Sequence, residues 1–189
     1  MISELFPITD YTKLQYDNEG LYSITNYTEA DQISNIIVNM FTDIKNLCIL
    51  DGTGGIGGNT ISFSKYFSKV TSIELNKERF IMLKNNISNY NITNIKLFNV
   101  DSVEYVFNNY NKYNIYFFDP PWGGPDYKKY KNLTLKMGNK TLLEIVKFLK
   151  EKSTDKLIIF KLPFNYNFNE FYQYDYKLYK IKKYYIIII

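Results

Sequence analysis

The sequence predicts an α/β fold with a mostly parallel seven-stranded sheet, helices on both faces and a short N-terminal cap. Three observations lead to this prediction. Short apolar runs alternate with longer helical patterns from residue 46 onward. A glycine-rich turn follows the first apolar run, as in parallel sheets that bind nucleotides. The run 184–189 ends in four consecutive isoleucines, which suits a central strand buried on both faces.

The expected strands follow the apolar runs, and the expected helices fill the segments between them. Thr28 and Asp31 resemble a capping box that would open a first helix ending near Thr42. The other helices are expected near 57–68, 77–89, 102–111 and 139–152. The strands are expected at 46–51, 70–74, 95–100, 114–119, 156–162, 174–179 and 184–189.

The length of 189 residues suits a single domain over 1–189 with a core of its own. We expect residues 1–27 to form an N-terminal cap and substrate segment, and residues 28–189 to form the core. Neither a membrane-spanning apolar run nor a signal-peptide pattern is present, and a single cysteine allows no disulfide framework. We therefore expect an intracellular protein, cytoplasmic or nuclear, that has no membrane partner. We also expect it to be a monomer. The AT-rich codons implied by frequent Asn, Lys, Ile and Tyr suit a large DNA virus or an AT-rich eukaryote.

Histidine is absent from the chain. Its absence excludes Ser-His-Asp catalysis, histidine general bases and ordinary zinc sites, so we expect no metal. The chemistry must then use carboxylates, hydroxyls, backbone groups or a cofactor. The net charge of +4 is compatible with a polyanionic partner but does not identify one.

A nucleotide-type cofactor is predicted at the glycine-rich turn after the first strand. Gly52, Gly54 and Gly57 form the pattern Gly-x-Gly-x-x-Gly, which lets the backbone approach a ligand closely. Asp51 can accept hydrogen bonds from a cationic ligand group. Glu74 ends the second strand near the spacing of about 20 residues at which an acidic side chain binds a ribose diol. The alternatives are a purely structural turn and a solvated charge at Glu74.

Asp101 follows the third strand, where a side chain could reach an adenine ring. N-capping of the next helix is an equal alternative for Asp101. Nicotinamide and S-adenosylmethionine cofactors both fit these features, so the choice between them depends on the fourth strand.

The most informative segment, Asp119-Pro120-Pro121-Trp122, directly follows the fourth strand. Two successive prolines form a rigid turn without amide donors, which leaves carbonyl oxygens free to accept. Asp119 and the Pro120 carbonyl could accept both hydrogens of an exocyclic purine amine and stabilise its developing positive charge during methylation. Trp122 would stack on the base, a contact worth about 1–3 kcal/mol in single-stranded sites. A buried turn with a core tryptophan is the alternative.

The longer segment 120–127, Pro-Pro-Trp-Gly-Gly-Pro-Asp-Tyr, resembles the hallmark of the trimethylguanosine synthase family of RNA cap guanosine-N2 methyltransferases. Segments 17–25, 51–60 and 160–165 extend the resemblance over nearly the whole chain. It implies a Rossmann-like class I methyltransferase fold, S-adenosylmethionine as cofactor and RNA with a 7-methylguanosine cap as partner. The implied products are 2,7-dimethylguanosine and 2,2,7-trimethylguanosine caps.

Together with the residue patterns above, the resemblance assigns expected roles to individual residues. Trp122 would stack on the methylated guanine, whose cationic ring strengthens its contact with indole. The expected catalytic residues are Asp119, Pro120 and Trp122. The expected cofactor-binding residues are Phe6, Thr25, Asp51, Gly52, Gly54, Glu74, Asp101 and Asp119. The expected substrate-binding residues are Ser23, Asn59, Trp122, Tyr127 and Lys161.

The chain departs from the family pattern at two of these places. Family members usually have serine where this chain has Asp119, and aspartate is a stronger acceptor that adds charge. The arginine expected to bind cap phosphate is Phe164 here. Lys161, or the lysines at 128, 129 and 131, would then take its place, and a solvated lysine face is the alternative for those three.

Two other functions remain open at this point. Asp119-Pro120-Pro121-Trp122 also resembles the segment of messenger-RNA adenine methyltransferases, which makes guanine-N2 or adenine-N6 of internal RNA an alternative substrate. The other alternative is a catalytically inactive cap-binding protein that keeps the fold.

Overall fold

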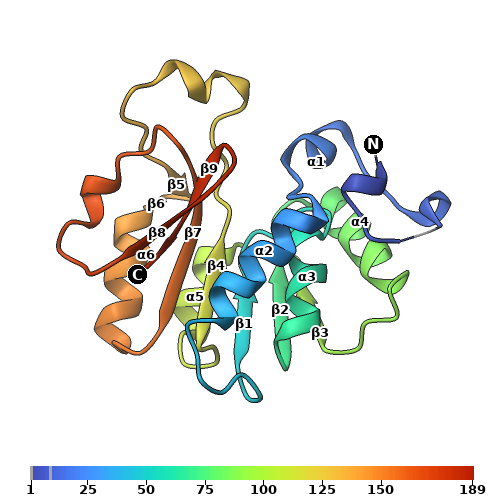
Figure 1. The fold of residues 1–189 in the computed structure, drawn as a ribbon, viewed down its shortest axis with the longest axis horizontal. Helices are drawn as coiled ribbons and strands as arrows, with labels where there is room; N and C mark the ends of the chain where they lie inside the picture. Colours follow the sequence, from blue (N-terminus) through green and yellow to red (C-terminus); the bar gives the residue numbers. More distant parts are fainter. Residues whose placement is uncertain (1, 9) are drawn as a thin grey trace.

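A seven-stranded sheet forms the centre of the computed structural model, which describes residues 2–8 and 10–189 except the Pro125 side chain. The strand order is β3-β2-β1-β4-β7-β9-β8, and only the pairings of β9 are antiparallel (Figure 1). The predicted mostly parallel sheet is therefore confirmed. The strands are β1 (Cys48–Asp51), β2 (Lys69–Ile73), β3 (Ile95–Phe98), β4 (Ile115–Phe118), β7 (Leu157–Pro163), β8 (Lys177–Ile181) and β9 (Tyr184–Ile188).

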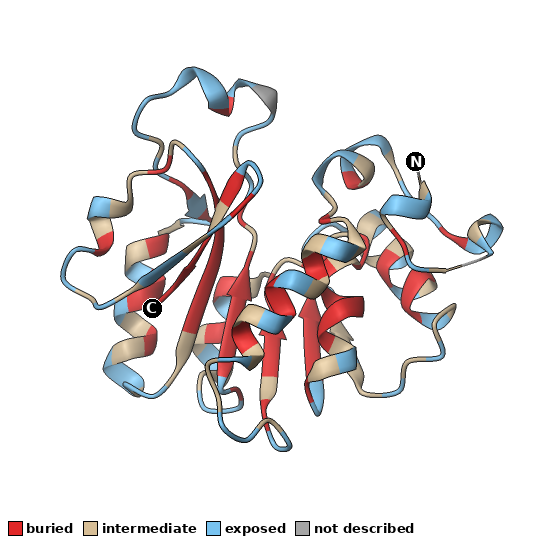
Figure 2. Ribbon diagram, in the orientation of Figure 1, coloured by how far each residue is buried: buried red, intermediate tan, exposed pale blue. Residues whose placement is uncertain are grey.

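Helices cover both faces of this sheet, as predicted (Figure 1). The helices are α2 (Tyr27–Val38), α3 (Gly58–Tyr66), α4 (Lys77–Ser88), α5 (Ser102–Asn109) and α6 (Leu142–Lys152). Side chains alternate along the strands, so that Ile115 and Phe117 pack with α2 and α3 whereas Tyr116 and Phe118 pack with α5 and α6. Figure 2 shows the resulting pattern, with buried central strands between helices whose outer faces are exposed.

The connections contain several short elements that the sequence patterns did not predict. A small hairpin of β5 (Lys136–Met137) and β6 (Lys140–Thr141) precedes α6. The 3-10 helices are η1 (Ile2–Glu4), η2 (Tyr11–Lys13), η3 (Pro125–Lys129) and η4 (Phe168–Phe171). None of the described helices is both long enough and apolar enough to cross a membrane.

The start of the first long helix differs from its prediction. Asn26, rather than Thr28, is its N-cap, and the Asn26 side chain accepts from the Glu29 amide and donates to the Glu29 carboxylate. Asn is a better N-cap than Thr, and Asn26 is placed to pair with Glu29 in the first turn. This reciprocal pair therefore opens the helix. The helix ends at Val38, and a short helix that was not expected, α1 (Asn18–Ser23), precedes it.

The last two strands lie near the two apolar runs in which they were expected, and one of them is shifted. β9 lies between β7 and β8, which confirms the central, buried strand expected at the end of the chain. β8 begins at Lys177 instead of Tyr174, because the tight turn at Lys182 and Lys183 aligns Ile181 with Tyr184 and thereby fixes the register.

The N-terminal segment is attached to the core by the fully buried Asn86 of α4. Asn86 accepts from the Gln15 amide at 2.8 Å and donates to the carbonyls of Gln15 and Ile56, each at 2.9 Å. Further along, residues 24–25 pass directly over the start of α3, where a Cβ at Gly58 would lie 2.5 Å from the Thr25 carbonyl oxygen. The attachment therefore places Thr25 at the carboxyl edge of the sheet.

We expect Asn86→Ala to lower the free energy of unfolding by about 2–4 kcal/mol, because the buried backbone groups at Gln15 and Ile56 lose their partners. Urea denaturation followed by circular dichroism measures this change. Ser88→Ala, on the exposed face of the same helix, is the control and should change stability by less than about 0.5 kcal/mol. Equal effects of the two substitutions would contradict the role given to Asn86.

Candidate active site

The candidate site lies where β1, β2, β4 and β7 end, at the carboxyl edge of the sheet. This edge is the usual ligand position in open parallel sheets, because the loops that follow the strands meet there. It brings together the glycine turn, Glu74, the Asp119-Pro120-Pro121-Trp122 segment and Lys161.

The glycine turn is anchored to both neighbours of β1. The Gly52 amide donates to the Phe117 carbonyl of β4 at 2.8 Å, and the Gly54 amide donates to the Ile73 carbonyl of β2 at 2.7 Å. A Cβ at Gly54 would lie 2.4 Å from Ser72 Oγ, so only glycine permits this approach. Gly54 therefore has a structural function whether or not a ligand binds.

Asp51 is fully buried at the end of β1. Its Oδ2 accepts from Thr60 Oγ1 at 2.6 Å, and its Oδ1 accepts from the Thr53 amide at 3.1 Å. Burial raises the pKa of Asp51 to about 7, with repulsion from Asp119 and Glu74 acting in the same direction and the two hydrogen bonds opposing it. A cation placed here would therefore favour the ionised carboxylate.

Glu74 has backbone partners on both carboxylate oxygens. Its Oε2 accepts from the Gly55 amide and its Oε1 from the Asn76 amide, each at 2.8 Å. Arg79 lies 3.8 Å from Oε1 and makes a second ion pair with Glu19 of α1 at 2.6 Å. Each carboxylate oxygen has further lone-pair positions, so hydroxyl donors of a ligand could still bind.

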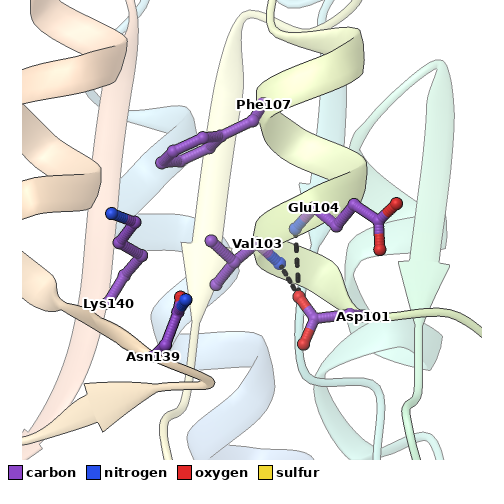
Figure 3. A pocket seen from close by; sticks show the side chains of 6 residues that line it. All are labelled: Asp101, Val103, Glu104, Phe107, Asn139 and Lys140. Carbon is purple, nitrogen blue, oxygen red and sulfur yellow. Dashed lines mark hydrogen bonds between the residues drawn. The ribbon is translucent and has the colours of Figure 1, made fainter.

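Asp101 is the N-cap of α5, as one of the two sequence interpretations held. Its Oδ1 accepts from the amides of Val103 and Glu104 at 2.8 and 3.0 Å (Figure 3). A crevice of about 340 Å³ adjoins it, lined by Asp101, Val103, Glu104, Phe107, Asn139 and Lys140. Because the helix uses Oδ1, Oδ2 is the oxygen through which Asp101 could contact a ligand in this crevice.

Asp119 and Lys161 form an enclosed ion pair. Lys161 Nζ lies 2.7 Å from Asp119 Oδ2, with 7% and 16% of the two side chains exposed. Lys161 Nζ also donates to Thr25 Oγ1 at 3.0 Å, and Asn59 Nδ2 lies 3.1 Å from the same hydroxyl. The Asp119 amide donates to Thr53 Oγ1 at 2.7 Å. Burial raises the pKa of Asp119, and the Lys161 ammonium opposes that rise.

Trp122 lies against aromatic rings and remains only partly buried. Its ring meets Tyr127 edge-on at a centroid distance of 5.2 Å and Tyr184 at 6.4 Å, and Nε1 lies 3.4 Å from the Lys161 carbonyl oxygen. Asn165 holds the adjoining η3 by donating to the carbonyls of Tyr127 and Tyr130. Trp122 is thus positioned by the core while part of its surface stays accessible.

Other expected site residues lie apart from this cluster or have partners elsewhere. Phe6 is fully buried in a cluster with Ile56 and Leu83. Ser23 Oγ donates to the Glu19 carbonyl within α1. Phe164 is 53% exposed, and Lys129 pairs with Asp126 at 2.7 Å. In the described part of the chain, no group of His, Cys, Asp and Glu side chains has an arrangement that could hold a metal ion.

Sequence reasoning missed two residues that organise the cluster. Thr53 connects Asp51 to Asp119, and its place inside the glycine turn was a signal that could have identified it. Tyr184, whose ring lies 4.8 Å from Lys161 Nζ, gave no such signal because only the pairing of β9 with β7 brings it to the site.

Residues 46–188 match the model of a family described as RNA cap guanine-N2 methyltransferase. An uncharacterized protein of Acanthamoeba polyphaga mimivirus is 35% identical, over 94% of this chain and 78% of its own length. The trimethylguanosine synthase of Schizosaccharomyces pombe is 32% identical, over 59% of this chain. The match covers 47% of the yeast enzyme, so the chain corresponds to about half of that relative.

Solved structures with the same fold include two described as putative methyltransferases. The protein from Porphyromonas gingivalis superimposes with a TM-score of 0.64 at 13% identity, over 92% of this chain and 42% of its own. The protein from Streptococcus mutans, solved in complex with SAH, gives a TM-score of 0.55 at 15% identity, over 87% of this chain and 98% of its own. The sheet of this chain is thus the Rossmann-like sheet of class I methyltransferases.

The raised pKa of Asp51 predicts a pH-dependent stability. A folded-state pKa of about 7 means that the fold favours the neutral carboxyl of Asp51. The contribution of Asp51 to the free energy of unfolding is therefore fully present below about pH 4 and is lost as the pH rises to about 7. As the pH rises between these values, the free energy of unfolding of Asp51→Asn should increase by up to about 4 kcal/mol relative to that of the unsubstituted protein. Denaturant titrations at several pH values measure the difference, and parallel pH profiles for the two proteins would contradict the assignment.

Proposed function

The chain belongs to the RNA cap guanine-N2 methyltransferase family, and from this premise we propose that it methylates the 2-amino group of guanine in 7-methylguanosine-capped RNA. The cofactor is S-adenosylmethionine, and the products are 2,7-dimethylguanosine and 2,2,7-trimethylguanosine caps. One observation carries the proposal: the Asp119-Pro120-Pro121-Trp122 turn lies at the end of β4, beside the buried carboxylate of Asp51.

The chemistry of the edge residues fits S-adenosylmethionine. This cofactor supplies a methyl group on a positively charged sulfonium sulfur. Repulsion from Asp119 and Glu74 helps to raise the pKa of Asp51, and a bound cation would offset this repulsion. Asp51 would lie nearest the methionine part and Glu74 would accept from the ribose hydroxyls. The complex of the Streptococcus mutans protein with SAH supports a cofactor of this class.

The base would lie against the accessible surface of Trp122. An exocyclic amine is a weak nucleophile because its lone pair is delocalised into the ring. Asp119 and the Pro120 carbonyl would accept its two hydrogens, which orients the nitrogen and stabilises the positive charge that it gains. Because the amine proton becomes acidic as this charge develops, no strong base is needed. The absence of histidine is thus compatible with the reaction.

Recognition of the cap phosphates would fall to exposed lysines near η3. Lys161 was one candidate for this contact, but its ammonium is directed to Asp119 and Thr25 and its side chain is 7% exposed. Lys128 and Lys131 are exposed, and they lie in or just after η3, which begins three residues after Trp122. Charge near the phosphates would add affinity without specifying the base.

Mass spectrometry of a 7-methylguanosine triphosphate cap analogue tests the proposed reaction. We expect mass gains of one or two methyl groups after incubation with protein and S-adenosylmethionine, located on the 2-amino group by fragmentation. Unmethylated guanosine cap and uncapped adenosine-containing RNA are the comparison substrates. Methylation of internal adenosine without any product on the cap analogue would refute the proposal, and binding of the cap analogue without turnover would indicate a cap-binding protein.

Trp122→Ala should lower kcat/KM for the cap analogue by about 5- to 150-fold, the loss expected for a stacking contact of about 1–3 kcal/mol. Cofactor affinity, measured by calorimetry, should change little because the Trp122 side chain contacts Tyr127, Tyr184 and the Lys161 carbonyl rather than Asp51 or Glu74. Tyr172→Ala, at an 83% exposed aromatic residue, is the control and should leave kcat/KM unchanged. A loss of activity that only parallels a loss of thermal stability would instead identify Trp122 as a core residue.

A further inference from the structure

Lys161 is a buried lysine whose ammonium points into the candidate site. Its side chain is 7% exposed, and Nζ contacts Asp119 Oδ2 at 2.7 Å and Thr25 Oγ1 at 3.0 Å. The rings of Trp122 and Tyr184 lie 5.5 and 4.8 Å from Nζ. All these groups are partners for a cation. The Lys161 ammonium is therefore already bound by groups of the protein itself and has little access to a substrate phosphate.

The two members of the ion pair depend on each other. A buried ammonium without a partner is strongly unfavourable, and so is a buried carboxylate. The other titratable groups that face Asp119 are the Asp51 carboxyl and the Tyr184 phenol, since Asp119 acts on the pKa of both. Neither supplies a positive charge. Lys161 is thus the cation that balances Asp119 among the described residues around it.

The pairing uses only one oxygen of Asp119. Lys161 contacts Oδ2, and no other hydrogen bond to the Asp119 carboxylate is present among the described residues. The Asp119 amide is held separately by Thr53 Oγ1, which fixes the backbone of the turn. These two restraints leave Oδ1 to accept from a ligand.

We propose that Lys161 is a positioning residue for methyl transfer, which holds Oδ2 of Asp119 and keeps the carboxylate ionised so that Oδ1 accepts from the guanine amine. The proposal rests on the proposed function. It assigns Thr25 a supporting role, because the hydroxyl of Thr25 directs the ammonium toward Asp119. It also separates Lys161 from phosphate recognition.

A double-mutant cycle with Lys161→Met and Asp119→Asn tests this role on the cap analogue. Methionine keeps the apolar stem without the charge. We expect Lys161→Met alone to lower kcat by about 100-fold, the loss associated with a misplaced reacting group. In the Asp119→Asn background the same change should alter kcat by less than about twofold. Lys156→Met, just before the opposite end of β7, is the control and should leave kcat unchanged.

The pH profile supplies a readout that a structural role would not produce. Without the ammonium, Asp119 faces Asp51 and becomes harder to ionise, so kcat of Lys161→Met should recover as the pH rises. The double variant should lack this dependence. A loss of equal size in both backgrounds, or a Lys161→Met variant with an unchanged pH profile, would overturn the proposal. So would a raised KM for the triphosphate analogue with an unchanged KM for 7-methylguanosine nucleoside, which identifies a phosphate contact.

Carbon-13 NMR of the Asp119 carboxyl separates this inference from the proposed function. We expect the Asp119 resonance to titrate at higher pH in Lys161→Met than in the unsubstituted protein. An unshifted titration would refute the pairing even if the cap is methylated. If the unsubstituted protein methylates no cap analogue, the proposed function fails, and the methyl-transfer role of Lys161 fails with it, whereas the titration still decides whether Lys161 keeps Asp119 ionised.

Discussion

The site depends on how like charges are held together at the carboxyl edge of the sheet. Asp51 ends β1, Asp119 directly follows the adjacent parallel strand β4, and Glu74 follows β2 on the other side of β1. Strand pairing fixes these positions, so repulsion cannot be relieved by moving the carboxylates apart. It is instead balanced by donors aimed at each group: hydroxyl and amide for Asp51, two amides for Glu74 and an ammonium for Asp119. An edge of this kind would attract a cationic ligand.

The fold and the ligand edge could be predicted from sequence because both follow from local patterns. The apolar runs that gave β1, β4 and β7 are continuous in the chain, and the glycine turn and the proline turn follow directly after β1 and β4. The residues at which helices and strands begin were less predictable. Asn26 replaces Thr28 as the cap of α2, and the turn at Lys182 sets the register of β8.

The partners within the site could not be predicted, because they come from distant parts of the chain. Thr25 reaches Lys161 only because Asn86 attaches the N-terminal segment to α4 and Gly58 allows residues 24–25 to pass over α3. Tyr184 reaches Lys161 through the pairing of β9 with β7. No periodicity reports such contacts. Sequence patterns therefore identified which residue types gather at the edge but not which side chain neutralises which.

The ion pair between Asp119 and Lys161 limits the roles that Lys161 can have in substrate recognition. An aspartate before the prolines accepts more strongly than a neutral hydroxyl, but its burial requires a cation. Lys161 meets that requirement from within the protein, and an ammonium so engaged cannot also bind phosphate. In the proposed reaction, the exposed lysines near η3 would then contact the phosphate chain, and solvent screens their charges. Under the proposed function, the buried ion pair would orient the amine and the exposed lysines would attract the RNA.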